Sequence, residues 1–209
     1  MISQLSHDSI FCNALSAIQQ AGKDNHEHSI TLGKTPGLKL SASPITNGDP
    51  TNGNVNSNWP GAFTDIHNHS NDMPPSAGDI YNLVKLNNRN GVYRTRFVIT
   101  LRATVYALYV YDADLADDFA VKYPAEQTVG FSPRFPEPIF DDVDRVSIYF
   151  EGRGEDRLIA QERALSFILS KYHCGIVLLK RDSSGNFKIL VTEEAIYHNE
   201  KRYVSAVCN

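Results

Sequence analysis

The stretch of residues 92–112, VYRTRFVITLRATVYALYVYD, sets the strongest limit on how this chain can fold. β-Branched and aromatic residues dominate it, as they do in strands that lie inside a sheet. Its length and composition predict two strands that join near Arg102–Ala103. Residues 175–193 contain two further β-rich runs separated by Asp-Ser-Ser-Gly-Asn, which predicts a hairpin. The fold must therefore be built on a β-sheet.

Helical and strand patterns follow one another along the rest of the chain. Hydrophobic periodicity predicts helices at residues 9–22, 76–88, 113–123 and 155–172, and strands at residues 27–34, 37–45 and 62–69. Residues 46–61 are rich in Asn, Gly and Pro and predict a long loop, whereas the proline-punctuated residues 124–138 follow no regular pattern. The element order favours an α/β (α+β) fold, with a single mixed β-sheet layered with helices. A chain of 209 residues with an apolar fraction of 42% suffices for one domain with a core.

The charge of the chain argues against a nucleic-acid partner. The formal net charge is −4, and no run of lysine or arginine supplies the basic surface that phosphate binding requires. A weak basic cluster is interpreted as a solvated sheet face; it consists of Arg89, Arg94, Arg96 and Arg102. Asp141, Asp142 and Asp144 are interpreted as a solvated turn, because they lack the ligand spacing of a calcium loop.

Membrane and disulfide signals are also weak. No window approaches the roughly 18 apolar residues of a membrane span, and the N-terminus lacks the pattern of a signal peptide. The three cysteines, Cys12, Cys174 and Cys208, form no CxxC pair and indicate neither a disulfide framework nor a cysteine zinc site. We expect a soluble, cytoplasmic protein without a membrane partner.

The segment TDIHNHSNDMPPSAGDI, residues 64–80, has the most concentrated chemical signal. His67 and His69 are two positions apart on a predicted strand, so their side chains point to the same face. Asp79 lies in the first turn of the following helix, from which a tight loop can bring it back to the strand end. Three such ligands would leave one tetrahedral position open, as in catalytic zinc sites.

Each half of this segment also has a simpler explanation. Ser76 and Asp79 have the spacing of a capping box at the start of a helix. For residues 76–79 taken alone, this is the favoured interpretation. The two histidines alone could be ordinary polar residues at a strand end. The combination in one strand–loop–helix unit favours a metal site.

The same segment resembles the JAMM signature of the JAB/MPN family, in which HxHP is followed by SxxD. The resemblance implies that His67, His69 and Asp79 are zinc ligands and that Ser76 stabilises the oxyanion of the reaction. It departs from the family at Ser70, where proline is usual, and in a loop that is one residue shorter. The family also has an upstream glutamate that acts as general acid and base, and Glu27 is the only glutamate before His67.

The resemblance extends to fold and activity. It implies a JAB/MPN-like (cytidine-deaminase-like) core over residues 1–123. It does not explain residues 124–209, which we interpret as a C-terminal α/β-hairpin extension that packs on the same domain. The implied function is that of a zinc metallopeptidase or isopeptidase, which hydrolyses an amide bond through a metal-activated water. The implied substrate is a peptide or the tail of a ubiquitin-like or sulfur-carrier protein. The alternative is a catalytically silent MPN-like module that binds a protein partner.

Overall fold

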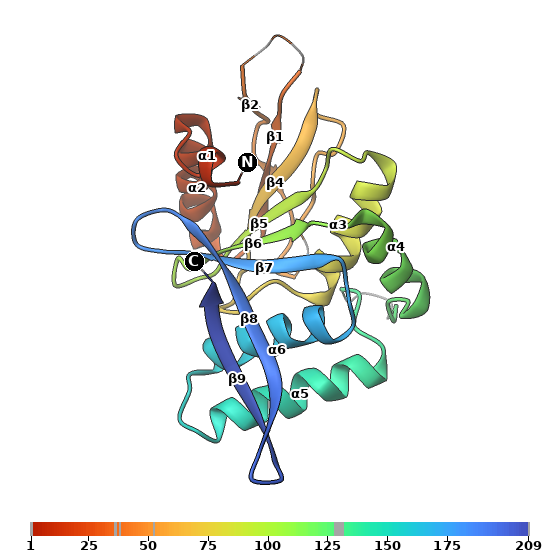
Figure 1. Ribbon diagram of the computed structural model, residues 1–209. Coiled ribbons are helices and arrows are strands. Elements are labelled where there is room, and N and C mark those ends of the chain that lie inside the picture. The colour runs from red at the N-terminus through yellow and green to blue at the C-terminus, as the bar shows by residue number, and fades with distance from the viewer. Residues whose placement is uncertain (1, 36, 38, 52, 128–131, 209) are drawn as a thin grey trace.

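A computed structural model describes residues 2–35, 37, 39–51, 53–127 and 132–208. Its centre is one β-sheet with the strand order β2-β1-β4-β5-β6-β7-β8-β9, and β3 pairs with β1 beside β2 (Figure 1). The strands are β1 (His28–Gly33), β2 (Ser41–Ala42), β3 (Thr46–Asn47), β4 (Ala62–Asn68), β5 (Thr95–Ile99), β6 (Val105–Val110), β7 (Ile176–Arg181), β8 (Phe187–Tyr197) and β9 (Glu200–Cys208). Only the β4–β5 pair is parallel among these strands. The structure thus confirms the expected fold class, a single mixed sheet layered with helices.

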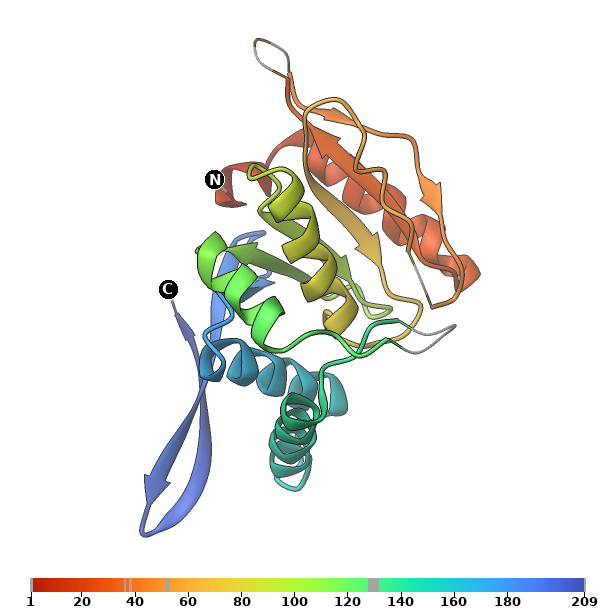
Figure 2. The same ribbon diagram turned by 90° about the vertical axis from the view of Figure 1, so that its right-hand side faces the viewer.

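The parallel pair explains the position of the helix that follows β4. Parallel neighbours need a crossover connection, which here contains α3 (Ala77–Arg89). Figure 2 shows α3 beside α4 (Ala113–Lys122) on one face of the sheet, with α2 (Ser9–Ala21) on the other. Leu83 and Leu108 belong to the apolar core on the α3 side, and Phe11 and Ile66 to the core on the α2 side. Both sheet faces are therefore covered where the central strands run.

The chain after α4 continues the same sheet. α5 (Glu137–Glu151) packs on α6 (Arg157–Lys171), and α6 contacts β7 and β8. The aromatic ring of Tyr203 in β9 meets those of Phe150 and Phe167, which lie on α5 and α6. Figure 1 shows β8 and β9 as a long twisted hairpin that extends beyond the other strands. The shortest helical elements are α1 (Ile2–Leu5) and the 3₁₀ turn η1 (Gly22–Asp24).

The predicted strand at residues 37–45 is largely wrong. Among its described residues only Ser41 and Ala42 are in a strand. The Ser43 hydroxyl accepts the Thr31 N–H at 3.0 Å, where a strand would use a backbone carbonyl, and Pro44 has no N–H to donate. The predicted loop at 46–61 likewise includes the short strand β3.

Two elements were missed in the C-terminal part. α5 begins with proline in its first turn and carries the acidic residues that were interpreted as a solvated turn. Asp142 is in fact 4% exposed and accepts hydrogen bonds from Arg145, Lys171 and Tyr172. The second missed element is β9, which pairs with β8 along nine residue pairs. Within the described ranges, every helix is too short or too polar to cross a bilayer.

Candidate metal centre

β4 positions His67 and the adjacent His69. The strand lies between β1 and β5, so its backbone is fixed on both sides. Although β4 ends at Asn68, the His69 N–H donates to the Ile99 carbonyl at 2.9 Å and keeps the chain in line with β5. The alternation of side chains then places His67 and His69 together, as the sequence predicts.

The N-terminus of α3 supplies the third residue. Ser76 is the N-cap, and its hydroxyl oxygen accepts the Asp79 N–H at 3.2 Å. The Asp79 carboxylate accepts the Ser76 N–H and the Ser76 hydroxyl, both at 2.7 Å. The capping box is thus confirmed, and the same bonds fix the Asp79 carboxylate toward the strand end.

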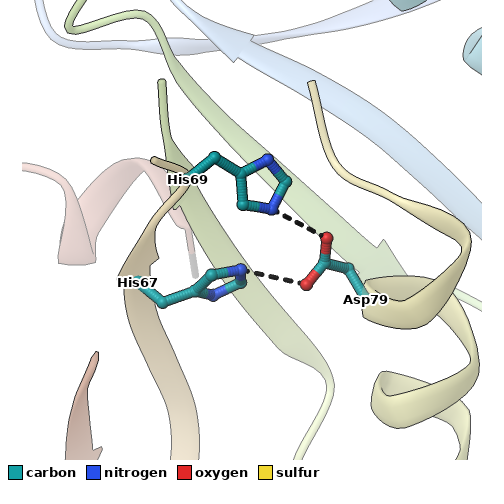
Figure 3. A group of neighbouring side chains, drawn as sticks. All are labelled: His67, His69 and Asp79. Atoms are coloured by element: carbon teal, nitrogen blue, oxygen red, sulfur yellow. Dashed lines mark hydrogen bonds and ion pairs between the residues drawn. The ribbon is translucent and has the colours of Figure 1, made fainter. Parts of the chain in front are cut away.

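The three side chains converge as Figure 3 shows. The Nε2 atom of His67 lies 2.9 Å from Asp79 Oδ1, and the Nε2 atom of His69 lies 3.1 Å from Asp79 Oδ2. All three residues are buried, with exposed fractions of 4%, 7% and 6%. Their ligand atoms all lie within 4.8 Å of one another, so the group can hold a metal ion.

The other nitrogen of each imidazole already has a partner. His67 Nδ1 lies 3.2 Å from Asp65 Oδ2, and His69 Nδ1 lies 3.1 Å from the Met73 carbonyl. When Nδ1 donates to such an acceptor, Nε2 keeps its lone pair for a metal, and metal-binding histidines usually have this partner. Both imidazoles are therefore oriented with Nε2 toward Asp79.

A buried polar network supports this arrangement from behind. Asp65 is fully buried and accepts hydrogen bonds from Tyr93 at 2.7 Å and from Arg96 Nε at 3.1 Å. Arg96 also reaches Asp79 Oδ1, at 3.5 Å. The interpretation of Arg96 as part of a solvated face is wrong, because only 3% of it is exposed. The parallel pairing of β5 with β4 places Arg96 opposite Asp65, and the sequence of β5 alone does not indicate this register.

These contacts set the charge of the site. Burial alone would lower the pKa of His67, but the Asp79 and Asp65 carboxylates outweigh it and raise this pKa to about 9. Burial would raise the pKa of Asp79, but the two histidines hold it well below its usual range. Burial would likewise raise the pKa of Asp65, which Arg96 and His67 keep low. Both carboxylates are therefore charged, and a metal ion that binds here would displace the proton that the raised pKa places on His67.

Glu27 directly precedes β1 and lines the same cavity as His67, His69 and Asp79. The Asn68 amide holds the backbone on both sides of it: Asn68 Oδ1 accepts the His28 N–H, and Asn68 Nδ2 donates to the His26 carbonyl, both at 2.8 Å. Burial raises the pKa of the Glu27 carboxyl above its usual range, although the two nearby imidazoles oppose this effect. A carboxyl group with a raised pKa is suited to proton transfer near neutral pH.

The cavity has a volume of about 840 Å³ and extends well beyond His67, His69 and Asp79. Residues Glu27, His67, His69, Ser76 and Asp79, all singled out from the sequence, line it together. Its walls also include residues of the 50–57 loop, one face of α3, and residues of α5 and α6. No family model matches the chain, and no curated protein matches it significantly.

Proposed function

We propose that this protein is a zinc-dependent hydrolase of amide bonds, a metallopeptidase or isopeptidase of the JAB/MPN type. The observation that carries the proposal is the orientation of the two imidazoles. Both present Nε2 to one buried carboxylate, and both have Nδ1 engaged by a second acceptor. Two nitrogens and one carboxylate are a common set of ligands for catalytic zinc, which keeps a further position for water or substrate.

The residues around the ligands have roles that suit this chemistry. Zinc, when bound, would lower the pKa of water to about 7 and polarise the scissile carbonyl. Glu27 would take a proton from the attacking water and deliver it to the leaving amine. Ser76, which lines the cavity and whose hydroxyl donates to Asp79, would stabilise the oxyanion. The large cavity suits a peptide or the tail of a ubiquitin-like or sulfur-carrier protein.

A Glu27→Gln variant tests this proposal with minimal change in shape. Zinc-loaded wild-type protein would be incubated with a peptide library from a cell lysate and with ubiquitin-like and sulfur-carrier proteins that carry an amide-linked C-terminal reporter. New peptide termini are detected by mass spectrometry. We expect cleavage by the wild type and at least about 100-fold slower cleavage by the variant at equal zinc content, as is typical when a general base is lost.

Two results would contradict this assignment. Full turnover by the Glu27→Gln variant would exclude Glu27 as the acid and base. A zinc-loaded wild type that cleaves none of these substrates would favour the silent binding module instead. The Glu27→Gln protein is purified in parallel with the wild type, so cleavage by a contaminating protease would appear equally in both samples.

A further inference from the structure

We infer that the cavity recognises an acidic segment of its polypeptide substrate, and that Lys85 and Arg89 of α3 bind the carboxylates of this segment. This inference rests on the proposed function, because it defines the substrate of the same site. It is carried by the distribution of charge along the cavity wall and by the helical spacing of two cations.

The charge of the cavity wall differs from that of the whole chain. The chain has a net charge of −4, and yet its cavity is basic away from the metal ligands. Among the described lining residues, Glu27 and Asp79 are the acidic side chains, and both lie at the metal-ligand end. The basic ones are Lys85, Arg89, Arg96 and Arg134.

Lys85 and Arg89 are the two cations available to a ligand. Of the other two basic residues, Arg96 is buried and already bonded to Asp65 and Asp79, and Arg134 already has an interaction partner of its own. Lys85 and Arg89 are exposed, and neither has an ion pair within the part of the chain that the structure describes. The C-terminal end of α3 favours a cation at Arg89, but this effect fades within one turn and does not explain Lys85.

The helix sets the distance between these cations and the metal ligands. Positions Asp79, Asn82, Lys85 and Arg89 recur at three- and four-residue intervals, so they follow one face of α3, and all four line the cavity. At 1.5 Å per residue, Lys85 lies about 9 Å and Arg89 about 15 Å along the axis from Asp79. An extended peptide advances about 3.3 Å per residue, so these distances correspond to about three and about five residues.

An acidic polypeptide fits this surface better than a nucleic acid does. Lys85 and Arg89 match two carboxylates, whereas phosphate backbones are usually held by many more basic contacts. The negative charge of the whole chain also opposes a long polyanion, but it acts weakly on a short acidic segment at physiological salt. The Glu27 and Asp79 carboxylates would repel acidic side chains at the scissile bond itself and thus place them farther along the cavity.

Fluorescence anisotropy can test the inference without a need for turnover. One fluorescein-labelled peptide carries a Gly-Gly pair followed by glycine, serine and three glutamates, and its counterpart carries three glutamines instead. We expect wild-type protein at 150 mM salt to bind the glutamate peptide about tenfold more tightly, because each exposed ion pair contributes a factor of a few. A Lys85→Gln/Arg89→Gln variant should lose this preference and keep the zinc content of the wild type.

A Lys122→Gln/Arg153→Gln variant is the matched control. It removes one lysine and one arginine, both exposed and both outside the cavity lining, and should keep the tenfold preference. Equal binding of the two peptides by a wild type that holds zinc and cleaves amides would overturn the inference and leave the proposed function intact. Loss of the preference in the control variant would also overturn the inference. So would competition in which a single-stranded oligonucleotide displaces the labelled glutamate peptide at a lower concentration than the unlabelled glutamate peptide does.

A protein without zinc binding that still prefers the glutamate peptide would separate acidic recognition from the proposed hydrolysis. A protein that binds no zinc but still discriminates between the peptides through Lys85 and Arg89 would support acidic recognition. The same result would remove the basis for hydrolysis and indicate a binding module.

Discussion

Asp65 connects the His67–His69–Asp79 group with the interior of the protein, and its replacement by asparagine should affect both the candidate site and the stability of the fold. The carboxylate is fully buried and accepts hydrogen bonds from Tyr93, Arg96 and His67. Asparagine has the same shape but no charge, and its amide nitrogen is a donor where the carboxylate accepts. At least one of the three donors must therefore lose its acceptor.

The size of the effect follows from the remaining partners of Arg96. Breaking a buried ion pair by removing one partner costs about 3–5 kcal/mol. Arg96 keeps Asp79, at 3.5 Å, as a second carboxylate partner, which reduces this cost. We expect Asp65→Asn to lower the free energy of unfolding by about 3 kcal/mol. It should also weaken zinc binding about 10- to 100-fold, because His67 Nδ1 loses the carboxylate that orients the ring.

Urea unfolding and competition with a chromophoric zinc chelator measure the two effects separately. Asp8→Asn is a matched control, because Asp8 caps α2 and asparagine caps equally well; its free energy of unfolding should change by less than about 0.5 kcal/mol. A Tyr93→Phe variant removes one bond to Asp65 without a charge and should cost about 1.5–3 kcal/mol. An Asp65→Asn variant that loses less than about 1 kcal/mol and binds zinc as tightly as the wild type would refute the reasoning.

Two further predictions concern residues behind the site and in the C-terminal helices. Asn68→Ala should keep its zinc but hydrolyse substrate more slowly, because the backbone on both sides of Glu27 loses its buried hydrogen bonds; unchanged turnover at full zinc content would contradict this role. Asp142→Asn should destabilise the protein at pH 7, because Asp142 joins α5 to Lys171 of α6. Burial would raise the pKa of Asp142, but Lys171 and its other partners hold it below the usual range, so its stabilising effect exists above pH about 4 and is lost as the pH falls through the lowered pKa. Urea unfolding of both proteins between pH 7 and pH 3 should show a difference that shrinks on acidification, and a constant difference would contradict the assignment.

The convergence of His67, His69 and Asp79 was predictable because its determinants are local. Alternation on β4 brings His67 and His69 together, and the spacing of Ser76 and Asp79 defines the start of α3. These patterns need no knowledge of distant residues. The two strands at 92–112, the helices at 113–123 and 155–172 and the hairpin after residue 175 were predictable for the same reason, and the structure confirms them.

The missed features depend on neighbours that are far away in the sequence. Arg96 looks like a surface cation until β5 pairs with β4 and places it beside the Asp65 carboxylate. In α5, acidic residues obscured the apolar series Ile139, Val143, Val146 and Phe150, although a proline in the first turn and this helical spacing were visible. Residues 37–45 alternate as a strand does, but β1 ends at Gly33, opposite Ser41, and Pro44 has no N–H with which to continue the pairing after Ser43.

The zinc content of the purified protein tests the central claim most directly. Elemental mass spectrometry would compare wild type, a His67→Ala/His69→Ala variant and a His7→Ala/His198→Ala control, all produced without a histidine tag. The control removes two exposed histidines outside the cavity lining. We predict close to one zinc per chain in the wild type and the control, and none in the His67→Ala/His69→Ala variant. A wild type that holds no metal even after zinc is added back, or equal zinc in all three proteins, would contradict the metal centre.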